Sequence, residues 1–130
     1  LVLEWNPGSF MPATRGEREQ LERVFSNLID NAIKYTPRGS VIVASGWDAE
    51  SRRVYVDIQD TGLGIAPEDL PQLFSRFHRG RRVEDTTIPG TGLGLAIVKE
   101  IVDLHSGEIQ VQTELDKGSR FRILLAVAAY

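Results

Sequence analysis

Cysteine is absent from this 130-residue chain, and histidine occurs only twice. The first absence excludes a disulfide framework and a thiolate metal site, and the second leaves too few imidazoles for a histidine-based metal site. No apolar run approaches the roughly 20 residues that a membrane-spanning helix needs. The net charge is −3, whereas nucleic-acid binding as a main task needs a basic face. We therefore expect a soluble domain that has no structural metal and does not bind nucleic acid.

What the chain does contain fits one globular unit. Its composition is 42% apolar and 25% charged, and its length suits a single domain with a sizeable core. No signal-peptide pattern precedes the apolar opening, and the chain does not begin with methionine. We expect residues 1–130 to form one domain of a longer protein.

The hydrophobic pattern predicts helices and paired strands in alternation. Apolar residues recur at helical spacing from about Arg15, after a capping-box pattern, until Pro37 prevents continuation. A second long helix ends near His105, where Gly107 suits a left-handed cap. Alternating patterns predict strands over the ranges 1–5, 40–47, 53–59, 108–114 and 119–127, and a short helix is predicted over 67–74. Because the strands come in pairs, the fold class is α+β: a two-layer sandwich whose mixed, mostly antiparallel sheet has helices on one face.

The segment GTGLG, residues 90–94, has three glycines at alternate positions directly before the second long helix. Backbone N–H groups at a helix start can approach phosphate closely when no Cβ intervenes. The spacing is neither GxGxxG nor a Walker loop. By itself the segment is as typical of a plain tight turn with a helix cap as of a phosphate-binding loop.

A second glycine loop, DTGLGI at residues 60–65, follows a predicted strand. Asp60 at its mouth can accept a hydrogen bond from an exocyclic amine such as that of adenine, while the glycines let a base lie against the backbone. Taken alone, the loop favours a simpler interpretation, a turn closed by an Asx cap.

The first helix has a polar stripe beside its apolar one. Asn27 and Asn31 lie four residues apart, with Lys34 and Tyr35 one turn further along. Asparagine is a poor helix former, so two of them beside a core stripe need a reason. An amide oxygen suits Mg²⁺, Lys34 suits phosphate and the Tyr35 ring suits a purine face. A solvated helix face explains the same residues.

Together these segments resemble, in order and spacing, the ATP-binding catalytic domain of sensor histidine kinases, of the Bergerat ATPase superfamily. NLIDNAIKYTP (27–37) resembles the N box and DTGLGI (60–65) the first glycine box. LFSRFHRG (73–80) resembles the F box, and GTGLGLAIVKEIVDLHSG (90–107) the second glycine box. The resemblance covers nearly the whole chain from Gly16 to Val127.

The resemblance implies a Bergerat fold, the cofactors ATP and Mg²⁺, and a role for each matching residue. Asn31 would bind Mg²⁺, Asn27 would contact phosphate or a metal-bound water, and Lys34 and Arg79 would contact phosphate. Phe74 and Phe77 would anchor a lid over residues 76–89. The full set of implied cofactor-binding residues is Asn27, Asn31, Lys34, Tyr35, Asp60, Gly62, Gly64, Ile65, Phe77, Arg79, Gly90, Thr91, Gly92, Leu93 and Gly94; Asn27, Lys34 and Arg79 would be catalytic.

Two departures from the superfamily refine the expected activity. Hydrolysing members have a glutamate four residues before the metal-binding asparagine, and Asn27 at that place cannot take a proton. Neither His78 nor His105 has the acid and proline context of a phosphoacceptor histidine. The sequence thus predicts a histidine kinase catalytic domain that transfers the γ-phosphate of ATP to a histidine elsewhere. The alternatives are an ATP-binding regulatory module without transfer and an anti-sigma-type serine kinase.

The resemblance also implies partners and a location. The expected partners are a histidine-bearing dimerisation domain of the same parent protein and a response regulator downstream, in two-component signal transduction. The isolated domain is expected to be a cytoplasmic monomer without direct membrane contact, its parent a homodimer that a membrane anchor can hold.

Overall fold

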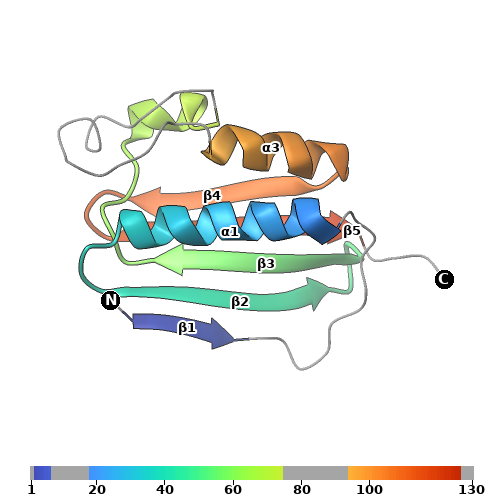
Figure 1. The fold of residues 1–130 in the computed structure, drawn as a ribbon, viewed down its shortest axis with the longest axis horizontal. Helices are drawn as coiled ribbons and strands as arrows, with labels where there is room; N and C mark the ends of the chain where they lie inside the picture. Colours follow the sequence, from blue (N-terminus) through green and yellow to red (C-terminus); the bar gives the residue numbers. More distant parts are fainter. Residues whose placement is uncertain (1, 7–17, 75–93, 127–130) are drawn as a thin grey trace.

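The computed structural model of the protein describes residues 2–6, 18–74 and 94–126. In these ranges one five-stranded sheet carries two α-helices on one of its faces (Figure 1). The α-helices are α1 (Arg18–Lys34) and α3 (Gly94–Leu104), and a short 3-10 helix, η1 (Pro67–Gln72), lies after β3 in the sequence. The strands are β1 (Val2–Asn6), β2 (Ser40–Asp48), β3 (Arg53–Asp60), β4 (Glu108–Glu114) and β5 (Gly118–Ala126).

The strand order across the sheet is β1-β2-β3-β5-β4. β2 with β3, β3 with β5 and β5 with β4 pair antiparallel, whereas β1 pairs parallel with β2. Because α1 separates β1 from β2 in the sequence, these three elements form a βαβ unit at one edge of the sheet. The expected α+β sandwich, with a mixed and mostly antiparallel sheet under helices, is confirmed.

The core lies between the helices and the sheet. On α1 the fully buried side chains recur every four residues, at Val24, Leu28 and Ala32. Alternate residues of the central strands face them, for example Val54 and Ile58 on β3. The remaining buried members of the core are Val41, Val43, Val98, Ile101, Val102, Phe121, Ile123 and Leu125.

None of the helices in the described part of the chain has the length and apolar character of a membrane span.

The cap of α3 corrects one expectation. Ser106, not Gly107, takes the left-handed conformation, with φ of 54°. The Gly107 N–H donates to the Val102 carbonyl at 2.9 Å, the bond that closes a Schellman-type helix end. A Cβ on Gly107 would lie 2.7 Å from the Leu124 carbonyl oxygen. Glycine is therefore needed at position 107 for close packing against β5 and not for its backbone angle.

Two further boundaries differ from the sequence pattern. The segment expected as a short helix over 67–74 is the 3-10 helix η1, which contains Pro71 and ends at Gln72. Asp60, expected to open a loop, is the last residue of β3 and pairs with Ser119 of β5. The capping-box pattern near Arg15 and the expected lid over 76–89 lie outside the described residues.

The sheet face away from the helices carries an ion pair between neighbouring strands. Arg122 of β5 donates from Nε and from one terminal nitrogen to the two carboxylate oxygens of Asp57 on β3, at 2.6 and 2.7 Å. Its guanidinium also lies 4.3 Å from the centre of the Tyr55 ring. The Asp57 side chain is only 12% exposed. Arg122 therefore compensates a carboxylate that has largely lost its water.

Arg122→Ala should lower the free energy of unfolding by about 2–3 kcal/mol, because it leaves the Asp57 carboxylate buried and unpaired. Arg53→Ala is the matched control, since Arg53 pairs with Glu108 on the same face at 3.3 Å but both side chains are substantially exposed. The control should cost less than about 1 kcal/mol. Urea unfolding of both variants measures the difference. Equal losses would show that burial of Asp57 does not matter.

Candidate nucleotide-binding site

Three segments distant in sequence meet at one end of the sheet: the end of α1, the loop after β3 and the β4–β5 hairpin (Figure 1). The Leu63 N–H donates to the Tyr35 carbonyl at 3.1 Å, which ties the loop to α1. The Asp116 N–H donates to the Leu63 carbonyl at 2.8 Å, which ties the hairpin to the same loop. The first glycine box, residues 60–65, is therefore fixed between a helix end and a hairpin.

Asp60 is the buried carboxylate of this region. Its residue is 8% exposed, and its Oδ1 accepts the Gly62 N–H at 2.9 Å, the Asx turn that the sequence favoured. Burial raises the pKa of Asp60, and the hydrogen bonds from the backbone N–H groups of Gly62 and Ser119 offset this only in part. The Thr36 hydroxyl also favours the charged form, although it makes no hydrogen bond with any described residue.

The carboxylate of Asp60 retains acceptor capacity. Two oxygens offer about four lone-pair sites; the Gly62 N–H donates to Oδ1, and the Ser119 N–H also favours the charged form. None of the causes that shift its pKa is a cation. A buried acceptor with no charged partner in the described ranges suits a neutral donor group such as an amine.

The two glycines of the loop are explained by contacts within the protein. A Cβ on Gly62 would collide with the Tyr35 carbonyl, and one on Gly64 would collide with the Glu114 carbonyl. Gly64 also has φ of 72°, which favours glycine. These glycines let the loop fit between α1 and the hairpin, whether or not a ligand also approaches them.

The polar residues of the N box lie together along α1. Asn27 and Asn31 are half-buried on the flank of the apolar stripe, and Lys34 one turn later is exposed. Within the described ranges the side chains of these three residues make no hydrogen bond or ion pair with the protein. Tyr35 is half-buried and directly follows the helix. Asn27, Asn31 and Lys34 thus lie along the last two turns of α1, and Tyr35 follows at the point where the Asp60 loop is attached.

The second glycine box is described only from Gly94. Gly94 begins α3, is exposed, and a Cβ there would meet no atom within 4 Å. Ile65 is half-buried, and its N–H donates to the Thr113 hydroxyl at 2.9 Å. Phe74 packs edge-on against Phe121, with 6.4 Å between ring centres. The remaining predicted site residues lie outside the described residues: Phe77, Arg79, Gly90, Thr91, Gly92 and Leu93.

Three hydroxyl side chains near Asp60 are absent from the sequence-based set: Thr36, Thr113 and Ser119. Thr36 is 1% exposed and Ser119 8%. The sequence indicates two of them: Thr113 and Ser119 fall where the alternation of apolar and polar residues along β4 and β5 predicts an apolar, core-facing residue. A polar residue at a core-facing position next to a candidate site is the pattern that could have identified them.

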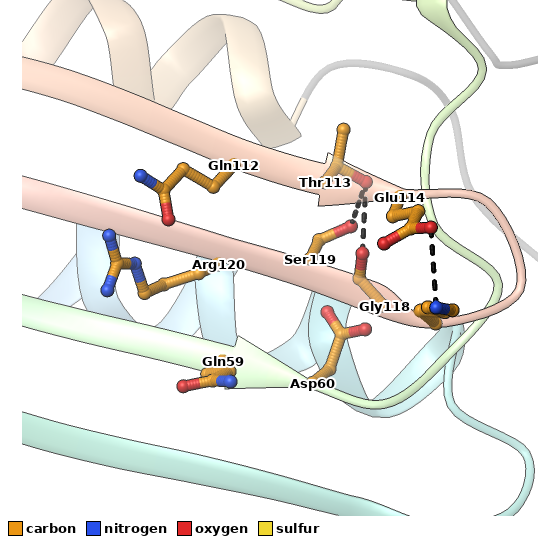
Figure 2. Close-up of a pocket in the computed structure, with 9 residues that line it drawn as sticks. Gln59, Asp60, Gln112, Thr113, Glu114, Gly118, Ser119 and Arg120 are labelled. Atoms are coloured by element: carbon orange, nitrogen blue, oxygen red, sulfur yellow. Dashed lines mark hydrogen bonds and ion pairs between the residues drawn. The ribbon is translucent and has the colours of Figure 1, made fainter.

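A polar pocket of about 300 Å³ opens over the ends of β3, β5 and β4 (Figure 2). It includes Asp60 and Ser119, but Gln59, Gln112 and Arg120 alternate with core-facing residues and so lie on the sheet face away from the helices. This pocket is therefore distinct from the space beside Asn31 on α1.

Comparison with known proteins gives the family. The model of histidine kinase-, DNA gyrase B- and HSP90-like ATPases matches residues 16–129. The phosphate regulon sensor protein PhoR of Pseudomonas aeruginosa is 39% identical over 114 residues, 88% of this chain and 26% of PhoR. The crystal structure of full-length ShkA with AMPPNP has a TM-score of 0.83 at 30% identity, covering 99% of this chain and 26% of ShkA. The mycobacterial sensor histidine kinase MprB has a TM-score of 0.80 at 30% identity, covering 98% of this chain and 84% of that one.

The chain belongs to this ATPase family, and within it to the sensor histidine kinases. It is the catalytic, ATP-binding domain of a two-component histidine kinase, as its N box and glycine boxes imply. It spans about a quarter of the length of PhoR.

Proposed function

We propose that this domain binds Mg-ATP at the end of α1 and transfers the γ-phosphate to a histidine on a separate dimerisation domain. The observation that carries the proposal is the Asp60 carboxylate, buried without a cationic partner among the described residues and with acceptor sites to spare. Such a group is costly to the fold unless a ligand uses it. Adenine offers the matching donor, its exocyclic amine.

Each residue around Asp60 would make a different contact with the base. The N–H groups of Gly62 and Ser119 hold the carboxylate in one orientation. Tyr35, at the junction of α1 and the loop, would lie against a purine face. Gly64 and Ile65 would line the base pocket from the loop side. Guanine would place a carbonyl oxygen where adenine has its amine, so this arrangement selects ATP.

The phosphate end of the site would lie along α1. Asn31 offers an amide oxygen of the kind Mg²⁺ accepts, and its side chain is bound to nothing else among the described residues, so the donor set fits the metal. A bound Mg²⁺ supplies positive charge that stabilises the transferring phosphoryl group. Lys34 would add a second positive charge, and Asn27 would orient a phosphate or a metal-bound water. Arg79 and the segment 90–94 would complete this end from outside the described residues.

Transfer is favoured over hydrolysis because α1 offers no general base at the expected place. Asn27 stands four residues before Asn31 and is an amide. Asp30 is a carboxylate but is exposed, whereas Asn31 beside it is half-buried. The protein's own residues thus position a phosphate without activating water.

The acceptor histidine would come from another domain of the parent protein, and a response regulator would receive the phosphate next. His105 lacks the acid and proline context of a phosphoacceptor, and its Nδ1 is engaged with the Ile101 carbonyl at the end of α3, at 2.8 Å. We place the domain in the cytoplasm, as a monomer in isolation and within a homodimeric parent.

The isolated chain should bind Mg-ATP, hydrolyse it very slowly and acquire no label from γ-labelled ATP. Adding the parent's histidine-bearing domain should produce label on that domain, because the missing part is the nucleophile. The control is the same domain with its acceptor histidine replaced by glutamine.

The chemical stability of the label separates the rivals. Phosphohistidine is lost in acid, so acid-labile label on the added domain supports the proposal. Acid-stable label would indicate serine transfer, and binding without any transfer would indicate a regulatory module. Label on the chain alone would contradict the separation of donor and acceptor.

A further inference from the structure

The β4–β5 hairpin is attached to the first glycine box at several points. The Ile65 N–H donates to Thr113 Oγ1 at 2.9 Å, and the Asp116 N–H donates to the Leu63 carbonyl. A Cβ on Gly118 would collide with the Asp60 carbonyl, and Gly118 has φ of 125°. The loop that carries Asp60 therefore takes its shape partly from the hairpin.

Thr113 is the side chain on which these contacts converge. Besides accepting from the Ile65 N–H, its Oγ1 lies 3.1 Å from the Gly118 carbonyl and 2.9 Å from Ser119 Oγ (Figure 2). Thr113 is half-buried and stands at a core-facing position of β4. One oxygen thus connects the loop, the turn of the hairpin and the first residues of β5.

The hydroxyl of Thr113 has one hydrogen and two candidate acceptors, Gly118 and Ser119. When it donates to the Gly118 carbonyl, the Ser119 hydroxyl donates to Thr113. When it donates to the Ser119 hydroxyl, the hydrogen of the Ser119 hydroxyl is available for another acceptor. Either way the Ser119 side chain is held, and Ser119 pairs with Asp60 across β3 and β5, where its backbone N–H favours the charged carboxylate.

We propose that Thr113 is a positioning residue for adenine recognition. It acts on both sides of the carboxylate: through Ser119 it fixes the strand partner of Asp60, and through Ile65 it fixes the loop that follows. Thr113 is not required to touch the nucleotide. This inference rests on the proposed role of Asp60 in binding the adenine amine.

Thr113→Val tests the inference, because valine keeps the shape and removes the hydroxyl. The measurement compares the dissociation constants of ATP and of purine riboside triphosphate, which has a hydrogen in place of the amine. Thr113→Val should weaken ATP binding by about tenfold and leave the analogue's affinity nearly unchanged, because only ATP uses the positioned carboxylate. A merely structural role would weaken both nucleotides equally or lower only the melting temperature.

Two further variants serve as controls. Thr113→Ser keeps the hydroxyl and should keep the wild-type ratio of the two affinities. Thr61→Val removes a hydroxyl from the same loop, one that accepts the N–H of Ser40 on β2 at 3.0 Å. It should also keep the ratio. If Thr113→Val does not fold, Thr113→Ala replaces it with the same expected outcomes.

The ratio of the two nucleotide affinities in wild type tests the role of Asp60 separately from the role of Thr113. If wild type binds both nucleotides equally, the role of Asp60 fails. If wild type prefers ATP and Thr113→Val prefers it to the same degree, Asp60 stands and the role of Thr113 is overturned. Loss of the preference in Thr61→Val as well would show general loop damage and also overturn it.

Discussion

Asn31→Ala should reduce phosphotransfer to the histidine-bearing domain by at least about 100-fold, because it removes the one ligand that α1 offers to Mg²⁺. The fold should be nearly unaffected. Asn31 is half-buried beside the apolar stripe, and alanine is a better helix former. The measurement is transfer of label from γ-labelled ATP at saturating nucleotide, with the urea midpoint of the same preparation.

Two comparisons sharpen this result. Without Mg²⁺, wild type and Asn31→Ala should bind ATP with similar affinity, and only wild type should gain affinity when the metal is added. Asp30→Ala is the matched control, since Asp30 is the exposed neighbour on the same helix and should be dispensable. Undiminished transfer by Asn31→Ala would contradict the metal role, and a large loss in Asp30→Ala would move the chemistry to Asp30.

The elements of the fold could be predicted from the sequence because their patterns are long and consistent. The bounds of β4 agree to the residue, and those of β2, β3 and β5 to about one. The parallel pairing of β1 was not predictable from its short apolar pattern, since nothing in five residues specifies a partner strand. The cap of α3 was misjudged for a related reason: the need for Gly107 comes from β5, which the local sequence does not reveal.

The candidate site was predicted in part. Spacing along one helix places Asn27 and Asn31 on one flank, because helical periodicity is a local property. The position of Asp60 beside the end of α1 follows only from the resemblance, since it depends on contacts between segments about 30 residues apart in sequence. Thr113 was missed because its role comes from the hairpin folding back onto the loop, and no local pattern encodes that contact.

Asp60→Asn should weaken ATP binding by about 10- to 100-fold. An amide keeps one oxygen for the backbone N–H groups of Gly62 and Ser119, but its NH₂ group would then face the adenine amine, donor against donor. Wild type should bind GTP far more weakly than ATP, and the variant should lose this preference. Direct titration with both nucleotides checks it. Equal affinities of wild type for ATP and GTP would refute the assignment.

The same variant should be more stable than wild type near neutral pH. Burial raises the pKa of Asp60 above its ordinary 3.8, so the folded state binds a proton more tightly than the unfolded state does. The contribution of Asp60 to stability is therefore fully present below pH 3.8 and is lost as pH rises through the folded pKa. Asparagine does not titrate. The stability difference between Asp60→Asn and wild type should grow in favour of the variant across that window and then level off.

Urea unfolding at a series of pH values measures this difference directly, because the other carboxylates titrate alike in both proteins and cancel. Asp48→Asn is the control of opposite sign: hydrogen bonds from Ser51 and from the Glu50 N–H lower the pKa of Asp48, which is exposed. Asp48→Asn should not be more stable than wild type at neutral pH. A variant at Asp60 that binds ATP poorly and is also less stable than wild type at pH 7 would show that the carboxylate serves the fold. The expected combination, weaker binding with greater stability, would show that its burial is maintained for the ligand.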